Sequence, residues 1–177
     1  MIDRFSVRQA VFDTAAGSRP GEMPGRLCRR LRTDLDVDAV TISLLSHTPH
    51  RQVYGASDAT ALGLELLQFE LGEGPSVDAS ALGRPVIADD LHGERRWPAF
   101  GPQARTRLPE AGALHAFPMR FGPRVLGAIG LVRYAAGTLS GDESERCATA
   151  ANAVAVVLLD DFHQLGHDGR APPRYPG

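Results

Sequence analysis

The sequence predicts an α+β domain built on one central antiparallel sheet of five to six strands. Three observations predict it: helical periodicity of apolar residues near both ends of the chain, two pairs of strand-like segments joined by short turns, and helix-like segments between those pairs. Short turns make neighbouring strands antiparallel, and amphipathic helices bury one side against a sheet. With 177 residues, 43% apolar and 23% charged, the chain has the size and composition of one globular domain.

Local patterns define the individual elements. Asp58 is expected to cap a helix whose Leu62, Leu66 and Phe69 share one side, and Ser140 with Glu143 forms a capping box before the last helix. Helices are expected over residues 5–16, 22–35, 58–69, 76–81, 97–108 and 140–162, and strands over 39–45, 51–56 (after a turn at 47–50), 84–88, 112–121 and 124–134.

The element order suggests two helical layers. The first and last long helices would cover one face of the sheet, and residues 58–108 would cover the other, where a ligand cavity is expected. The domain itself is expected at 22–162, after an N-terminal extension at 1–21. Residues 163–177 are rich in Gly and Pro near their end and are expected to form a disordered tail.

Composition excludes several classes of function. The formal net charge is −2 and all 19 basic residues are Arg, so we expect neither direct nucleic-acid binding nor lysine chemistry. The N-terminus lacks the continuous apolar core of a secretory signal, and the longest apolar run, 148–159, is too short to cross a bilayer. We therefore expect a cytoplasmic protein without membrane contact.

A set of short motifs between residues 71 and 140 is more specific than the composition. In order they are Leu71-Gly-Glu-Gly-Pro-Ser-Val-Asp-Ala79, Arg84-Pro-Val86, Asp90-Leu91, Arg96-Trp-Pro98, Phe100, Ala116-Phe-Pro-Met119, Leu126-Gly127, Leu131, Arg133 and Leu139-Ser140. In order and spacing they resemble actinobacterial GAF domains over roughly residues 22–161. Such domains are often fused to an ANTAR RNA-binding domain, and because no ANTAR segment follows here, we expect no RNA binding by this chain itself.

The resemblance has two departures that bear on a ligand. Ser76 stands where the family motif often has Cys, and Gly130 and Val132 replace a pattern that often carries Asp. If these positions line the pocket, its size and polarity differ from those of the relatives. No ligand is therefore carried over.

Two groups of residues are candidates for ligand binding. The segment 73–78, with Ser76 and Val77 at a helix start, is expected to present free backbone N–H groups and a hydroxyl to a polar or anionic ligand; the alternative is that Ser76 and Asp78 only cap the helix. A second group is expected to form an aromatic pocket, although plain core is the more common role of such residues: Phe69, Trp97, Phe100, His115, Phe117 and Met119. Gly130 is a further expected ligand-binding position.

Neither a metal nor a cofactor is expected. His115 has no partner at a fixed spacing that would suggest haem ligation, and His163 with His167 matches a metal pair only if the last helix continues beyond Gly166. Cys28 and Cys147 lie far apart, on the apolar stripes of helices, rather than beside the expected pocket. The sequence contains no GxSxG motif, and we expect no enzyme.

The expected function is that of a stand-alone regulatory domain. It would bind a small-molecule effector between the sheet and the middle helices, and signal as a homodimer through its first and last helices, as the resemblance also implies. The alternative is an interaction module with a filled pocket that pairs with a signalling or transcription-regulatory protein. An open apolar cavity would favour the effector, and side chains filling that space would favour the interaction module.

Overall fold

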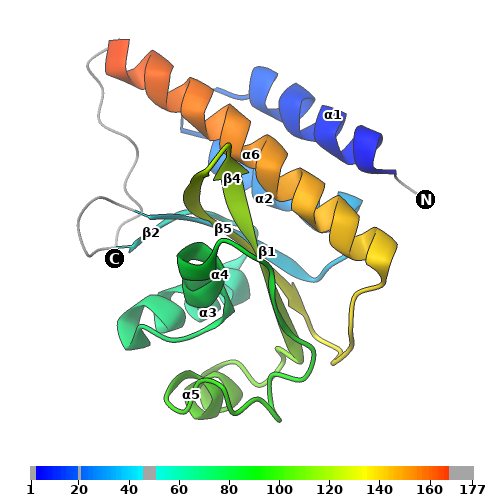
Figure 1. The fold of residues 1–177 in the computed structure, drawn as a ribbon, viewed down its shortest axis with the longest axis vertical. Helices are drawn as coiled ribbons and strands as arrows, with labels where there is room; N and C mark the ends of the chain where they lie inside the picture. Colours follow the sequence, from blue (N-terminus) through cyan, green and yellow to red (C-terminus); the bar gives the residue numbers. More distant parts are fainter. Residues whose placement is uncertain (1–2, 20, 46–50, 168–177) are drawn as a thin grey trace.

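One five-stranded antiparallel sheet lies between two layers of helices, as the sequence predicts (Figure 1). The computed structural model describes residues 3–19, 21–45 and 51–167. The helices are α1 (Arg4–Ala16), α2 (Met23–Asp34), α3 (Ala59–Leu71), α4 (Pro75–Leu82), α5 (Phe100–Arg107) and α6 (Gly141–His167). The strands are β1 (Ala39–Leu45), β2 (Arg51–Ala56), β3 (Val86–Ala88), β4 (Ala113–Phe121) and β5 (Arg124–Arg133).

The strand order in the sheet is β2-β1-β5-β4-β3. The short β3, which contains the residues after Pro85, forms one edge, as expected for a strand that begins at a proline. In the centre, Gly130 of β5 pairs with Thr41 of β1 on one side and with Ala116 of β4 on the other. These three residues therefore lie side by side on the same face of the sheet.

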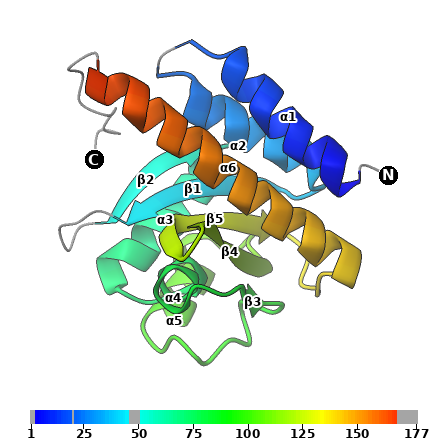
Figure 2. The same cartoon turned by 45° about the horizontal axis from the view of Figure 1, so that its top comes forward.

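The terminal helices α1, α2 and α6 cover the opposite face, as Figure 2 shows. Helix α1 lies along α6, and an ion pair of 3.7 Å joins Arg4 near the start of α1 to Glu145 near the start of α6. The capping box of Ser140 and Glu143 is present in both directions. The core of this layer includes Val7, Val11, Leu27, Leu31, Val40, Ile42, Phe117, Met119, Ile129, Leu131, Val154 and Leu158.

The middle helices α3, α4 and α5 cover the face that carries Gly130 (Figure 2). Asp58 caps α3 by accepting a hydrogen bond from the backbone N–H of Ala61, as predicted. The core of this layer includes Leu64, Leu67, Val86, Leu91, Trp97, Phe100, Leu114 and Val132.

The side of α3 that faces the sheet is not the one predicted. Leu66 is 48% exposed, and Leu62 and Phe69 are only partly buried. The helix instead buries a side that carries Glu65 and Gln68, together with Ala61, Leu64 and Leu67. The prediction failed because it placed the apolar residues Leu62, Leu66 and Phe69 toward the sheet, whereas the buried side of the helix includes two polar residues.

Two helix ends also differ from the prediction. Helix α5 begins at Phe100 rather than at residue 97, because Trp97 and Pro98 belong to the turn before it. Helix α6 continues past residue 162 to His167, so the first part of the expected tail is helical. The expected turn at 47–50 and the rest of the tail, 168–177, lie outside the described residues. Within the described part, no helix is both long and apolar enough to span a membrane.

Candidate functional site

A cluster of buried polar side chains lies between the sheet and helices α3 and α4. Its centre is the carboxyl group of Glu65 on α3, which is 1% exposed. Three groups donate hydrogen bonds to the same oxygen, Oε2: the hydroxyl of Thr41 on β1 at 3.0 Å, the hydroxyl of Ser76 on α4 at 3.0 Å, and the amide of Gln68 at 3.1 Å. We call Thr41, Glu65, Gln68 and Ser76 the Glu65 cluster.

The second carboxyl oxygen of Glu65 is buried and has no hydrogen-bond partner. Burial raises the pKa of Glu65 above its ordinary value of 4.5, and the hydroxyls of Ser43, Ser76 and Thr41, with the charge of Arg51, oppose that rise. No Arg side chain bonds to the carboxyl group among the described residues. The site thus holds an acidic group without a cationic partner, which is an expensive arrangement in a protein interior.

The cluster also ties α3 to α4. The backbone N–H of Ser76, in the first turn of α4, donates to the side-chain oxygen of Gln68 at 2.8 Å. The connecting bend has Gly72 in the left-handed region and Gly74 at φ 132°, and a Cβ on Gly74 would lie 2.5 Å from the Gln68 side chain. Only glycine fits at position 74, so the sequence of the bend itself sets how closely the two helices approach.

Gly130 forms the floor of the cluster. A Cβ at this position would lie 2.5 Å from Oγ1 of Thr41, 3.2 Å from Oγ of Ser76 and 3.3 Å from Oε2 of Glu65. The glycine therefore lets polar side chains from three elements meet over the centre of the sheet. In this conformation the side chains of Thr41, Ser76 and Glu65 fill the space above Gly130.

Several residues predicted from sequence lie in or beside this site. Ser76 and Gly130 belong to it directly, and Val77 is buried next to Ser76 on α4. The alternative that Ser76 and Asp78 cap α4 is wrong, because Gly74 occupies the cap position and no side chain caps the helix, and the backbone N–H of Ser76 donates to Gln68 in this conformation. Asp78 instead accepts a hydrogen bond of 2.9 Å from the indole N–H of Trp97.

The predicted aromatic pocket is wrong, because its members lie on opposite faces of the sheet. Phe117 and Met119 pack in the core under the terminal helices, whereas Trp97 and Phe100 pack in the core under the middle helices. His115 shares the face of Phe117 by strand alternation. The spacing correctly places three β4 residues together, but alternation alone does not say which helical layer they face.

His115 is a buried core residue beside an acidic one. Its Nε2 lies 3.2 Å from Oδ1 of Asp89 without the alignment of a hydrogen bond. Burial lowers the pKa of His115, and the charge of Asp89 opposes this. No group of three or more potential metal ligands occurs among the described residues, although α6 does continue past Gly166.

The two thiols lie in the terminal-helix layer, away from the Glu65 cluster. Cys28 and Cys147 are buried and not joined to each other. Burial raises the pKa of both thiols, that of Cys147 to about 12. A thiol with such a pKa is a poor nucleophile near neutral pH.

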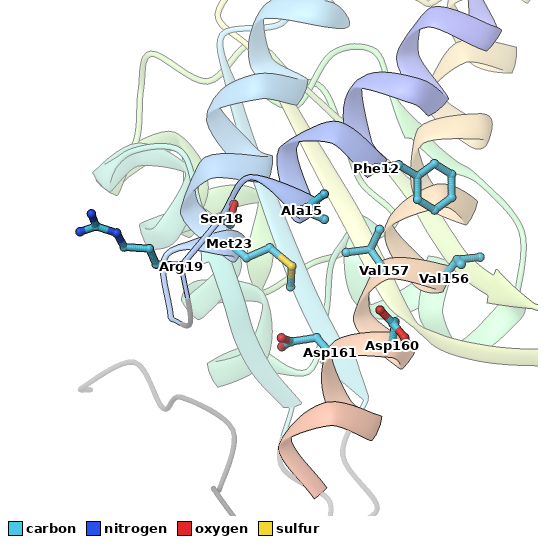
Figure 3. Close-up of a pocket in the computed structure, with 10 residues that line it drawn as sticks. Phe12, Ala15, Ser18, Arg19, Met23, Val156, Val157, Asp160 and Asp161 are labelled. Atoms are coloured by element: carbon cyan, nitrogen blue, oxygen red, sulfur yellow. The ribbon is translucent and has the colours of Figure 1, made fainter. Parts of the chain in front are cut away.

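A groove of about 670 Å³ opens between α1, α2 and α6 (Figure 3). Phe12, Met23 and Val157 form its apolar part, and Asp160 and Asp161 lie at its other side. Next to the groove, Tyr54 of β2 donates a hydrogen bond of 2.7 Å to Asp161. Val156 of α6 also lines the groove and is 39% exposed.

Sequence reasoning missed Thr41, Glu65 and Gln68. A usable signal exists: Ala61, Leu64, Glu65 and Gln68 recur at helical spacing, and Thr41 and Ser43 share one side of a strand that must be covered on both faces. Polar residues on the inward positions of two facing elements indicate a buried polar site.

Comparisons with solved structures identify the architecture. The chain is similar to the GAF domain of a phosphoenolpyruvate-protein phosphotransferase (ptsP) from Coxiella burnetii, with a TM-score of 0.72, 14% identity, and coverage of 93% of this chain and 97% of that one. The corresponding domain from Acinetobacter gives 0.69, 12% identity, and coverage of 90% and 95%. A free methionine-R-sulfoxide reductase from Neisseria meningitidis, solved with its substrate, gives 0.68, 10% identity, and 91% coverage of each chain.

The sequence itself is distant from these proteins. No protein-family model matches it, and no curated protein is significantly similar to it. The similar structures include GAF domains as well as a free methionine-R-sulfoxide reductase. From its sheet order, its two helical layers and these similarities, the chain has the fold of GAF domains.

Proposed function

We propose that this chain is a regulatory domain that binds a small-molecule effector at the Glu65 cluster. The observation that carries the proposal is the buried carboxyl oxygen Oε1 of Glu65, which has no hydrogen-bond partner among the described residues, because the neighbouring Ser43 hydroxyl donates to the carbonyl oxygen of Ala128 instead. A polar group that is buried without a partner lowers stability, and proteins retain such groups chiefly where they serve binding or catalysis. The location supports the same conclusion, since the cluster lies under the helices that the sequence predicted to cover a ligand.

Binding at this site requires the cluster to open. Ser76 and Gln68 now bond to each other and to Glu65, so an effector has to displace α4 from its contact with β5. The bend at Gly72 and Gly74 is the natural hinge for that movement, because glycine tolerates a wide range of backbone angles. A site that closes in the absence of its ligand is consistent with a sensor, whose two conformations must differ.

Native mass spectrometry of the protein purified from its own host tests this proposal. We expect a mass above that of the chain, which disappears on denaturation and releases a small molecule. The Glu65→Gln variant, purified in parallel, is expected to carry none. A wild-type protein of bare chain mass after gentle purification would contradict the proposal.

We also propose that the domain signals as a homodimer through α1 and α6. Val156 on α6 and Phe5 on α1 expose apolar surface on this layer, at 39% and 70%. The ligand site is linked to α6 through two strands of the sheet. Strand β1 carries Thr41 of the Glu65 cluster and pairs with β2. Strand β2 carries Tyr54, which donates a hydrogen bond to Asp161 on α6. A conformational change at the cluster thus has a path of contacts to the helices.

Light scattering at micromolar concentration tests the dimer. We expect twice the chain mass for the wild type and the chain mass for Val156→Arg. Leu82→Arg is the matched control, because Leu82 is an exposed apolar residue, 55% exposed, on α4 in the other helical layer. A monomeric wild type, or a dimer that Val156→Arg leaves intact, would exclude this interface.

The second candidate function is an interaction module that binds no effector. Its specific support is that the cluster side chains fill the space over Gly130, while the groove between α1, α2 and α6 is open.

For both candidate functions we propose no enzymatic activity, because both thiols are buried and lie away from the cluster. Reduction of methionine sulfoxide by the purified protein, if lost in Cys28→Ala or Cys147→Ala, would overturn that statement.

A further inference from the structure

The Glu65 cluster consists of donors aimed at one oxygen, and that arrangement selects the chemistry of a ligand. Three separate side chains donate to Oε2 of Glu65. Three donors on one oxygen stabilise a carboxylate, and they leave that oxygen no further capacity. What remains free is Oε1, which is buried and without a partner.

Both protonation states of Glu65 are incomplete in the closed structure. An ionised carboxylate lacks a cation, since the neighbouring groups on β1, α4 and β5 are Thr41, Ser43, Ser76 and Gly130, none of them charged. A protonated carboxyl group can carry its hydrogen on Oε2 and donate it to the hydroxyl of Thr41 or Ser76, but its Oε1 is then a buried carbonyl oxygen that receives no hydrogen bond. Arg51 on β2 acts on the group only through its charge.

The free oxygen suits a donor that binds through a single point. Guanidinium and amidinium groups bind carboxylates most strongly through two parallel hydrogen bonds, which needs both oxygens. With Oε2 already used, a compact ammonium group fits better.

We propose that the Glu65 cluster recognises the protonated amine of a small molecule with an apolar body. The apolar requirement follows from the surroundings, because Leu64, Ala116 and Ala128 belong to the core on the same face. This inference rests on the proposed function and deepens it by naming the ligand class. An effector without an amine would refute the class while leaving effector binding intact.

The test is calorimetric titration of the full chain with small primary amines, each paired with the alcohol of the same skeleton: propylamine with propanol, and 2-phenylethylamine with 2-phenylethanol. We expect the amines to bind at least ten times more tightly than the alcohols. Glu65→Gln is expected to remove this preference. Glu70→Gln is expected to keep it, because Glu70 is on the same helix but 61% exposed.

The pH dependence provides a readout that a structural role of Glu65 alone would not give. An amine binds the ionised carboxylate, so its affinity should rise as the pH rises through the pKa of Glu65 and then level off. A ligand that accepts a hydrogen bond from the protonated acid would show the opposite trend. The comparison is made within the pH range in which the amine stays protonated.

Three results would overturn the proposal: equal affinity for amines and alcohols, undiminished amine binding by folded Glu65→Gln, or no binding of any amine at millimolar concentration. The circular dichroism spectrum of each variant establishes that it is folded. Native mass spectrometry of the host-purified protein distinguishes failure of the amine proposal from failure of effector binding. A co-purified molecule without an amine refutes only the ligand class, whereas a bare chain refutes effector binding itself.

Discussion

The hydroxyl of Ser76 on α4 lies 3.0 Å from the carboxyl oxygen Oε2 of Glu65 on α3 and donates a hydrogen bond to it. This bond joins the two helices directly above Gly130, whose missing side chain leaves room for both groups. The same carboxyl group leaves its other oxygen buried and unpaired. The folded protein thus buries an acidic group whose second oxygen receives no hydrogen bond, and the first predictions below concern this group.

Replacing Glu65 by Gln should stabilise the protein without ligand at neutral pH. The variant removes a buried carboxyl group that has no cationic partner and keeps its shape, while its amide NH2 takes the place of Oε1 and finds no acceptor there, so we expect the free energy of unfolding to rise by only about 0.5 kcal/mol. Urea denaturation measures the difference. Glu70→Gln, on the exposed side of α3, should change stability little.

The gain should depend on pH in a defined direction. Burial raises the pKa of Glu65, so folding favours the protonated form, and this group's contribution to stability is complete below its ordinary value of 4.5. That contribution is lost as the pH rises through the raised pKa. The advantage of Glu65→Gln over wild type should therefore be small at pH 4 and grow toward pH 8. An advantage that shrinks with rising pH would contradict the burial of an unpaired carboxyl group.

Gly130→Ala should destabilise the protein through one specific contact. Its Cβ would lie 2.5 Å from Oγ1 of Thr41, and overpacking of this kind costs about 1–3 kcal/mol. Thr41→Ala removes the contacting oxygen, so the double variant Thr41→Ala/Gly130→Ala should be more stable than the sum of the two single changes predicts. Strictly additive losses in urea denaturation would show that the two positions do not meet as described.

Tyr54→Phe should weaken the contact between β2 and α6. The hydroxyl of Tyr54 donates to Asp161, and loss of a partly buried hydrogen bond to a charged group costs about 1–2 kcal/mol. Asp161→Asn is the informative partner variant, because it keeps an acceptor oxygen and should lose less. If the hydroxyl matters as proposed, thermal melts will rank Tyr54→Phe below Asp161→Asn.

Both cysteines should be unreactive in the folded protein. Cys28 is fully buried, Cys147 is 2% exposed, and burial raises the pKa of each thiol. Ellman's reagent should therefore modify neither thiol in native buffer over minutes, and both within seconds in guanidinium chloride. Rapid modification of one thiol in the native protein would reopen the question of thiol chemistry.

The sequence predicts the strands well because local patterns define them. The bounds of β1 and β2 agree with the runs of β-branched and aromatic residues, and the assignment of terminal and middle helices to opposite faces is confirmed. The caps at Asp58 and Ser140 are confirmed as well, since capping depends on residues within three positions.

The site was harder to predict because it depends on which face each residue occupies. Alternation along β4 groups His115 with Phe117, but the pairing of Ala116 with Gly130 decides which of the two sets faces the middle helices. Helix α3 misled for a related reason: Leu66 points outward while Glu65 points inward. A buried carboxyl group departs from the usual apolar stripe of a helix, and the helical spacing of Ala61, Leu64, Glu65 and Gln68 is the sequence signal that indicates it.

The most direct test of the central claim is a crystal structure of the protein purified from its own host. We expect electron density for a small molecule between the sheet and α4, with a nitrogen within hydrogen-bond distance of Oε1 of Glu65. A structure in which Glu65, Gln68 and Ser76 close on one another, with at most a water molecule at Oε1, would contradict it.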